Sequence, residues 1–499
     1  MKAKIYIFTL LLFCLACSQP NRLELALEAA GENRAELEKV LTHFQHDKLK
    51  LKAAKFLITN MPYHFSYDEF FLSPTGRRYR PDITLIGGRG AVENYSDSLL
   101  QRGYRIAGDR LPDITTVNSA FLINNIELAF KVWQKPWARD VPFMDFCRFI
   151  LPYRAQNELL SHLRREIMER FVPLLEAANA TTSLEAAKVI NEYLRVNRIV
   201  RYGYTGLPFY PTIEETYRSG ISQCEGLTDL GVFIMRAVGI PVAVDLTIWT
   251  KIDFGHTWAV VLDNGVFHAF EVAGAQPTEY ANVLADTWFR MPAKVYRRHF
   301  EPVDFSRLKN DDGFVLDFKS PLFEDVTNEY LTPTTTIRIA VGKQEDRQQS
   351  DQIYLTVHNF HRWKPIAVGR RSRGIGVFEN VVGDNVFMVA DSPNGRTLRF
   401  ITPPFHVSKE GEIHKLIPQL QDRQEFTIPK HRLRRRIPHT LFYWDIYYRH
   451  FLPLPYVSKT DSTRTYDQIP RNALLLFSMP HRCINQRVFF IQNDSIRRY

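Results

Sequence analysis

Cys224 and His256 are the two residues whose types and spacing indicate chemistry most directly. A cysteine is a strong nucleophile as the thiolate, and histidine is the side chain best suited to exchange a proton with it near neutral pH. A cysteine and a histidine in contact can therefore transfer acyl groups through a thioester. This chemistry depends on whether the fold brings the two side chains together.

The sequence after Cys224 predicts a helix that begins at this cysteine. Apolar residues recur at helical spacing from 227 to 238, Gly239 can end the helix, and Pro241 prevents its continuation. The free amide groups and the dipole at a helix start favour thiolate over thiol. We therefore expect Cys224 to be activated by its position.

Short apolar runs predict three β-strands, over residues 242–246, 256–262 and 266–272. The second strand begins with His256, and the sequence Asp-Asn-Gly at 263–265 is typical of a hairpin turn. A histidine on a strand would then face a cysteine at the start of a helix. An acyl-transfer enzyme with a cysteine nucleophile needs this arrangement.

Three short motifs resemble those of the transglutaminase-like superfamily of cysteine enzymes, and they occur in that family's order. They are Gln223-Cys224, the run from Arg236 to Pro241, and Gly255-His256-Thr257-Trp258. The specific resemblance covers roughly residues 181–275. It implies a papain-like α/β core in which Cys224 is the nucleophile and His256 is its partner.

The resemblance also implies a third residue, usually aspartate, on the next strand about fifteen positions after the histidine. Glu271 stands at this position. Glutamate keeps the negative charge but has a longer side chain than aspartate. Asp263 is the alternative, although its sequence context is that of a hairpin turn.

Four further residues are candidates for the oxyanion site or for the walls of a cleft. In the family, a backbone N–H at the cysteine and an aromatic or amide donor commonly stabilise the oxyanion. The candidates in this sequence are Gln223, Tyr204, Trp249 and Trp258. Trp258 lies on a predicted strand and could equally belong to the core. No metal or other cofactor is implied.

These residue types imply a reaction on amide bonds. Cys224 would attack a carboxamide carbonyl, His256 would protonate the leaving amine, and Glu271 would orient the imidazole. Water as the second acceptor gives hydrolysis, and an amine gives cross-linking. We expect hydrolysis of a protein, a peptide or a peptidoglycan stem peptide, because water is always present and no motif indicates an amine site. The alternative is a non-catalytic binding or scaffold protein that acts through its β-rich domain.

The N-terminal residues indicate export to the cell envelope. Residues 1–4 are basic, and residues 5–16 are apolar but too few to span a bilayer. Leu15-Ala16-Cys17 resembles the lipobox of bacterial lipoproteins, which implies lipidation of Cys17 and attachment to a membrane through the lipid. An ordinarily cleaved secreted protein is the alternative.

Charge and cysteine content argue against a nucleic-acid partner, a disulfide framework and a zinc ribbon. The formal net charge of +10 would suggest nucleic acid for a cytosolic protein, but export favours anionic envelope surfaces, so no nucleic-acid partner is expected. Two of the five cysteines lie in the signal, which leaves Cys147, Cys224 and Cys483. An odd number without a close pair argues against a disulfide framework and a zinc ribbon. Cys147 and Cys483 are expected to be buried, with a bridge between them as the alternative.

The distribution of periodic segments predicts a multidomain α+β protein, and its 499 residues suffice for several cores. Helical spacing dominates the N-terminal third, with an irregular or inserted segment at 63–112, and period-two alternation follows the core. Several short strands with turn signals are typical of a β-sandwich. The expected units are a lipoprotein signal peptide (1–17), a helical region (21–179), a transglutaminase-like core (180–302), a β-sandwich-like domain (303–424) and a β-rich extension (425–499).

Overall fold

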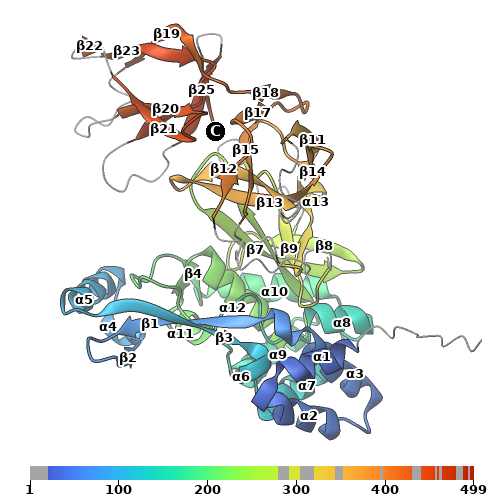
Figure 1. Ribbon diagram of the computed structural model, residues 1–499. Helices are drawn as coiled ribbons and strands as arrows, with labels where there is room; N and C mark the ends of the chain where they lie inside the picture. Colours follow the sequence, from blue (N-terminus) through green and yellow to red (C-terminus); the bar gives the residue numbers. More distant parts are fainter. Residues whose placement is uncertain are drawn as a thin grey trace, which may run out of the picture.

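The computed structural model describes residues 21–278, 291–303, 320–342, 352–393, 397–429, 440–455, 458–459, 463–478, 487–492 and 495–499. Helices lie at one end of the molecule and strands at the other, with a mixed core between them (Figure 1). This arrangement confirms the predicted multidomain α+β class. The expected signal peptide with Cys17, and Cys483, lie outside the described residues. In the part of the chain that the structure describes, no helix is long and apolar enough to cross a bilayer.

Helices dominate the N-terminal region, and those expected from apolar spacing are among them. They are α1 (Arg22–Ala29), α2 (Arg34–His43), α3 (Lys48–Asn60), α6 (Asp113–Thr116), α7 (Ser119–Trp133), α8 (Phe143–Phe149) and α9 (Arg164–Ala177), with the 3-10 turns η1 (Gly31–Asn33) and η2 (Met61–Tyr63). Their buried apolar residues, such as Leu57, Ile126 and Phe171, form one core with buried residues that follow Cys224. The helical region therefore packs directly against the helix that begins at Cys224.

The segment at 63–112 is ordered by a small antiparallel sheet and two helices. β1 (Phe65–Leu72) pairs with both β2 (Arg78–Tyr79) and β3 (Arg105–Pro112), and α4 (Ile83–Ile86) and α5 (Arg89–Gln101) connect β2 to β3. Of the two expected alternatives, an irregular loop or inserted short elements, the structure shows the second. Its glycines mark element boundaries, since Gly87 ends α4 and Gly103 follows α5, each with positive φ.

The core contains the helix and the strands predicted around Cys224 and His256. Its elements are α10 (Ser183–Val196), β4 (Arg201–Tyr202), α11 (Ile213–Ser219), β5 (Ile221–Ser222), α12 (Cys224–Ala237), β6 (Val242–Ile248), β7 (Gly255–Asp263), β8 (Val266–Phe270), β9 (Tyr296–Arg298) and β10 (Phe323–Asp325). Five strands form an antiparallel sheet in the order β10-β9-β6-β7-β8, and β4 pairs with β5 in parallel. Because β10 is the edge strand of this sheet, the core sheet extends beyond residue 302, where the sequence analysis placed the end of the core.

Local capping explains where the helices before Cys224 begin. Thr182 and Glu185 form a capping box at α10, and Thr212 and Glu215 form a second one at α11. Gly220 ends α11 in the left-handed conformation, and β5 then leads directly to α12. Short-range sequence signals therefore deliver the chain to the start of α12.

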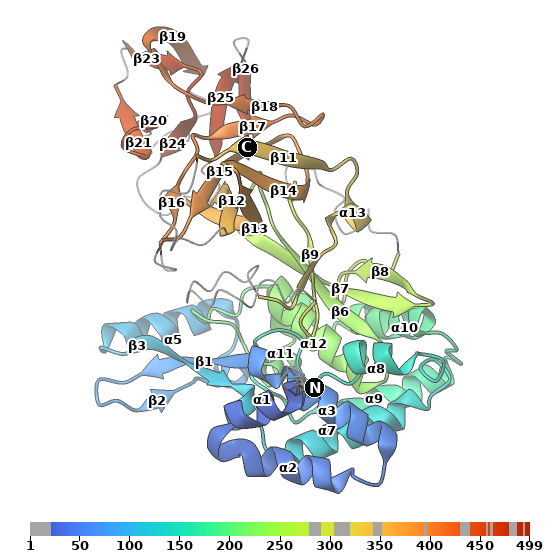
Figure 2. The same ribbon diagram turned by 45° about the vertical axis from the view of Figure 1, so that its right-hand side comes forward.

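The strand-rich region, β11–β26, contains two larger sheets that share an apolar cluster. The first sheet has the order β11-β14-β13-β12-β15-β17-β18, with β16 pairing with β15, and the second has the order β21-β20-β24-β25-β26. Trp363 and Met388 from the first sheet share an apolar cluster with Trp444 and Phe490 from the second. A third, small sheet has the order β19-β23-β22. Figure 2 shows this region above the core from a second direction.

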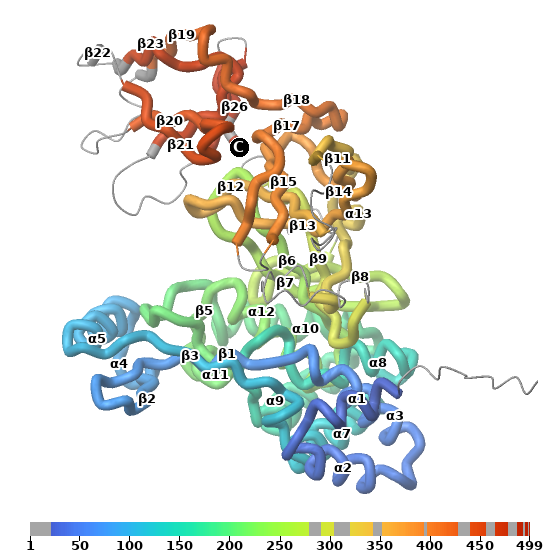
Figure 3. The backbone as a smooth tube through the Cα atoms, in the orientation of Figure 1, coloured from blue at the N-terminus to red at the C-terminus, as the bar shows by residue number. Residues whose placement is uncertain are grey.

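The bounds of these strands follow the chain in order. They are β11 (Thr335–Ala340), β12 (Gln352–Asn359), β13 (Arg362–Ser372), β14 (Ile375–Val381), β15 (Asn385–Asp391), β16 (Arg399–Phe400), β17 (Phe405–Val407), β18 (Ile413–Lys415), β19 (Gln419–Pro429), β20 (Thr440–Asp445), β21 (His450–Leu454), β22 (Ser458–Lys459), β23 (Thr463–Arg471), β24 (Leu475–Ser478), β25 (Val488–Gln492) and β26 (Ser495–Arg498). The short helix α13 (Thr327–Tyr330) links β10 to β11. The path of the backbone in Figure 3 runs from the helical end through the core to this strand-rich end.

Candidate active site

Cys224 is the first residue of α12, and its side chain is partly exposed. Gln223 precedes it as the N-cap in an extended conformation, without a side-chain capping bond. Every residue from Gly226 to Ala237 is buried, so the body of the helix is fixed in the core. The chain thus presents a partly accessible sulfur at the start of a rigid helix.

Two contacts join α12 to the segments that carry His256 and Glu271. The Thr228 hydroxyl donates to the carbonyl of Thr257, next to His256, at 3.1 Å. Gly231 lies against Val272, next to Glu271, and a Cβ at Gly231 would be 2.3 Å from a methyl carbon of Val272. The absence of a side chain at Gly231 therefore permits this close approach.

His256 contacts Glu271, and it is close enough to Cys224 for the sulfur to affect its ionisation. Its Nε2 is 2.6 Å from Glu271 Oε1, which leaves Nδ1 as the nitrogen available to Cys224. Burial lowers the pKa of His256, but hydrogen bonding with Cys224 and Glu271 outweighs it and raises this pKa from 6.5 to about 9. The imidazolium is therefore the favoured form of His256 at neutral pH.

The backbone after β8 fixes the position of Glu271. The N–H of Glu271 donates to the carbonyl of Ala275 at 3.0 Å. Asn191 of α10 accepts from the N–H of Ala273 at 2.8 Å and donates to the carbonyl of Ala275 at 3.2 Å.

Asp263, the alternative third residue, is the last residue of β7 and accepts from the N–H of Leu184 instead. Glu271 is therefore the candidate that contacts His256.

Both tryptophans predicted for the site flank the imidazole ring of His256. Trp249 stacks on it, with ring centroids 5.7 Å apart and an interplanar angle of 19°, and Trp258 lies 5.4 Å from it. Trp258 is fully buried, and its indole N–H donates to the hydroxyl of Tyr330 at 2.8 Å. Trp249 is 5% exposed. Both rings therefore form the support of His256 rather than the wall of an open cleft.

The remaining two candidates lie at the surface. Tyr204 is 44% exposed, and the guanidinium of Arg89 lies over its ring at 5.1 Å from the centroid. Gln223 is partly exposed next to Cys224. Of these two, Gln223 directly precedes Cys224 in the chain.

A cavity of about 360 Å³ is lined by Glu225, Gly226 and Asp229 near the start of α12. Tyr210 lines it as well, and burial together with the charges of Glu225 and Cys224 raises the pKa of this phenol. Sequence reasoning missed Tyr210, because no motif distinguishes it among the 22 tyrosines of the chain. Neither Cys224 nor His256 is among the residues that line this cavity.

Several carboxyl side chains line the wall of this cavity. Asp229 is buried, and burial followed by the charges of Glu158 and Glu225 raises its pKa well above the usual range. Gln156 donates to Asp229 at 2.9 Å. Asp229, Glu158 and Glu225 all line the cavity together with Arg80, so the wall contains both acidic and basic side chains.

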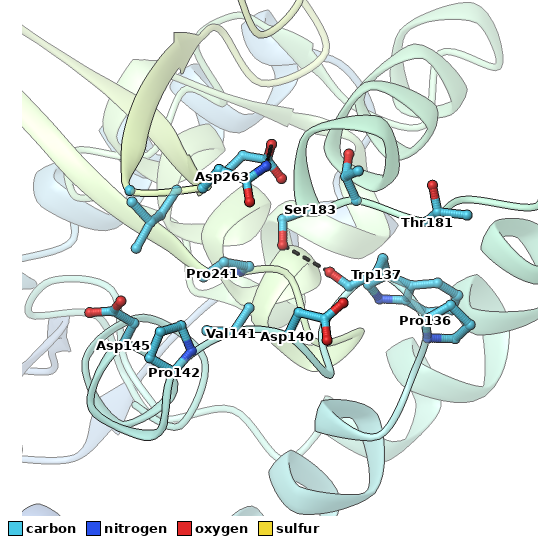
Figure 4. Close-up of a pocket in the computed structure, with 14 residues that line it drawn as sticks. Pro136, Trp137, Asp140, Val141, Pro142, Asp145, Thr181, Ser183, Pro241 and Asp263 are labelled. Carbon is cyan, nitrogen blue, oxygen red and sulfur yellow. Dashed lines mark hydrogen bonds between the residues drawn. The ribbon is translucent and has the colours of Figure 1, made fainter.

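A second cavity of about 400 Å³ lies at the other end of β7 (Figure 4). Asp140, Asp145 and Asp263 line it, and the hydroxyl of Ser183 donates to the carbonyl of Trp137 in its wall. Among the described residues, no group of three or more His, Cys, Asp or Glu side chains is arranged to hold a metal ion. Neither Cys224 nor His256 contributes to this cavity.

The sequence over residues 174–272 matches the family model of the transglutaminase-like superfamily. This part of the chain is a transglutaminase-like domain. It runs from the end of α9 to just past β8 and contains Cys224, His256 and Glu271. The family assignment thus covers the same residues that the geometry brings together.

Two solved structures are similar to the chain. A candidate cysteine protease from Cytophaga hutchinsonii has 15% identity and a TM-score of 0.19, covering 23% of this chain and 38% of that one. Red sea bream transglutaminase has 8% identity and a TM-score of 0.23, covering 63% of this chain and 71% of that one. The match therefore spans less than half of the length of the first structure. No curated protein matches the sequence.

Proposed function

We propose that the protein is a cysteine hydrolase that cleaves amide bonds of a protein, a peptide or a peptidoglycan stem peptide. The proposal is carried by the 2.6 Å contact of His256 with Glu271 and by the effect of Cys224, at the start of α12, on the pKa of His256. A thiolate beside an imidazolium is the pair that thioester chemistry requires. The transglutaminase-like assignment of residues 174–272 supports the same chemistry.

In the first half of the reaction, the sulfur of Cys224 attacks the carbonyl carbon and the C=O π electrons move to oxygen. The backbone N–H at Cys224 lies at a helix start and is suited to bind this oxyanion. Collapse of the tetrahedral intermediate breaks the C–N bond, and the proton of the His256 imidazolium passes to the leaving nitrogen. The products are a free amine and a thioester on Cys224.

In the second half, neutral His256 accepts a proton from water, and the resulting hydroxide adds to the thioester carbonyl. Collapse breaks the C–S bond and releases a carboxylic acid, which restores the thiolate and imidazolium. Glu271 keeps the imidazole oriented and stabilises its charged form. An amine in place of water would give transfer, so the acceptor decides between hydrolysis and cross-linking.

The proposed location is the cell envelope, where a lipid on Cys17 anchors the exported protein so that it faces the periplasm or lies at the outer membrane. The apolar stretch at 5–16 and the Leu15-Ala16-Cys17 motif at its end support it. Cys17→Ala in the producing bacterium should release the protein from the membrane fraction. A Cys17→Ala protein that stays in the membrane fraction would contradict lipid anchoring.

The proposed reaction is tested with purified protein and three probes: fluorescein-labelled casein, purified muropeptides, and casein with dansylcadaverine. We expect cleavage of casein or muropeptides by the wild type and none by Cys224→Ala. Incorporation of dansylcadaverine without cleavage would reassign the reaction to amide transfer. Equal, slow alkylation of Cys224 and Cys147 with no turnover of any probe would favour a binding or scaffold protein.

A further inference from the structure

The loop at 249–254, between β6 and β7, carries Trp249 and leads directly to His256. Trp249 covers one face of the His256 ring. Phe254, two residues before His256, has a φ of +72°. This left-handed conformation is unfavourable for a bulky residue and persists only when its surroundings hold it. The loop therefore needs an external support.

Asn359, the last residue of β12 in the strand-rich region, gives this support. Its side chain is fully buried, and its amide nitrogen donates to the carbonyls of Trp249 at 2.8 Å, Ile252 at 3.1 Å and Phe254 at 2.8 Å. Its carbonyl oxygen accepts from the N–H of Phe254 at 3.1 Å. One side chain thus holds both backbone polar groups of the residue with the unfavourable conformation.

Arg487, which directly precedes β25, holds the same loop from a second position. It donates to the carbonyl of Thr250 at 3.3 Å and lies 3.2 Å from the buried carboxylate of Asp253. The same Asp253 oxygen accepts from the N–H of Phe360 at 2.7 Å. Lys251 adds an ion pair with Asp384 at 2.8 Å. All of these partners belong to the strand-rich region.

We infer that the strand-rich region is a working part of the active site, in which Asn359 and Arg487 are positioning residues for His256. They fix the 249–254 loop, the loop fixes Trp249, and the stacked ring keeps the imidazole between Cys224 and Glu271. The inference rests on the proposed function, since the orientation of His256 has a consequence only if His256 takes part in the reaction. It assigns the region a role beyond docking or packing.

The experiment uses the full chain with three changes compared with the wild type. Asn359→Ala removes the contacts to the loop, and Arg487→Gln removes the ion pair with Asp253 while Asn359 stays. Thr356→Val is the matched control, because Thr356 is also buried in β12 but donates to the carbonyl of Met388 inside the strand-rich region. The readouts are the titration of His256 by NMR with labelled histidine and the rate of Cys224 alkylation by iodoacetamide at pH 7.

We expect Asn359→Ala and Arg487→Gln to move the His256 titration from about 9 toward 6.5. The groups whose charges and hydrogen bonds raise this value are Cys224 from α12 and Glu271 after β8, and a loosened ring loses contact with both. Alkylation of Cys224 should slow by about 10-fold, because the imidazolium no longer stabilises the thiolate. Thr356→Val should leave both readouts at wild-type values. Where a cleaved probe is in hand, the effect should fall on kcat rather than KM.

An unchanged His256 titration in folded Asn359→Ala would overturn the inference. If Asn359→Ala does not fold, Arg487→Gln is measured with the same two outcomes. The test is separate from that of the proposed function, since the titration needs no substrate. If the wild type cleaves amides but the His256 titration is unchanged in Asn359→Ala, the positioning role is refuted and the proposed function stands. If the wild type shows no turnover but the titration shifts in Asn359→Ala, the proposed hydrolysis is refuted and the positioning role stands.

Discussion

Cys147 and Cys224 occupy helices that pack into the same core, yet their surroundings are opposite. Cys147 is 1% exposed in the middle of α8, and burial, together with the charge of Glu301, raises its pKa to about 12. Cys224 is partly exposed at the start of α12 and helps to raise the pKa of His256. The comparison shows that the position of a cysteine on its helix and its nearest charged partner determine the reactivity of the thiol.

The histidines show the same contrast. His64 is fully enclosed and its Nε2 contacts the carbonyl of Phe300, and burial followed by the charge of Arg154 lowers its pKa well below 6.5. His358 is enclosed as well, and burial followed by the charge of Arg487 lowers its pKa to about 3. His256 is also enclosed, but Cys224 and Glu271 reverse the direction of the shift. A carboxylate at hydrogen-bond distance therefore distinguishes His256 from His64 and His358.

The contrast between the two cysteines predicts the largest effect. Cys224→Ala should reduce amide cleavage by on the order of 10⁴-fold or more, because the thioester can no longer form. Cys147→Ala, the matched control, should leave cleavage at the wild-type level and lower the free energy of unfolding by about 1 kcal/mol. The measurements are initial rates on a cleaved probe and urea unfolding. A fully active Cys224→Ala protein would contradict the assignment of the nucleophile.

Glu271→Gln tests whether the carboxylate makes His256 different from His358. The amide keeps the size of the side chain but removes its charge, so the imidazolium loses a partner. We expect cleavage to fall by roughly 10²- to 10⁴-fold. The measurement is kcat/KM with circular dichroism as a control for folding. Wild-type kcat/KM in Glu271→Gln would assign the third role to another acceptor.

The raised pKa of His256 predicts the alkaline limit of the reaction. A histidine whose folded pKa is raised stays protonated until the pH rises through that value, which is about 9 here. Protonation of the leaving amine therefore weakens as the pH rises through 9, and kcat/KM should fall there. In Glu271→Gln this limit should move toward 6.5. A limit near 6.5 in the wild type would mean that His256 lacks its two partners in solution.

Gly231→Ala should have the smallest effect on chemistry and a measurable one on stability. The added carbon would lie 2.3 Å from Val272, so α12 and the segment after β8 must separate. We expect a loss of about 1–3 kcal/mol in the free energy of unfolding. Gly90→Ala in α5 is the control, since nothing lies within 4 Å of its Cβ position. Equal unfolding free energies for the two variants would show that the close approach at Gly231 is not required.

Local sequence signals predicted the elements that carry the candidate site. The apolar spacing after residue 226 and the Gly-Ile-Pro run correctly indicated a helix that begins at Cys224. The capping pairs at Thr182 and Thr212 correctly marked two further helix starts. These signals act within a few residues, so the sequence contains them in full. The roles of Cys224, His256 and Glu271 themselves stay predictions.

Features that depend on distant contacts were not predictable. The sheet β1–β3 forms because strands on either side of the segment at 73–104 pair, and its turn residues resemble an irregular loop in sequence. Trp258 is enclosed by Tyr330, which lies on α13 far along the chain. Asn359 contacts Trp249 across 110 positions. No periodicity or motif in one sequence relates residues at such separations.

The most direct test compares the two cysteines in one sample. Folded protein is treated with iodoacetamide at pH 7, and alkylation of Cys224 and Cys147 is followed by mass spectrometry of the peptides, in the wild type and in His256→Ala. The account predicts that Cys224 reacts at least about 10²-fold faster than Cys147 and that His256→Ala slows Cys224 by about 10-fold. Equally slow alkylation of both cysteines, unchanged by His256→Ala, would contradict it.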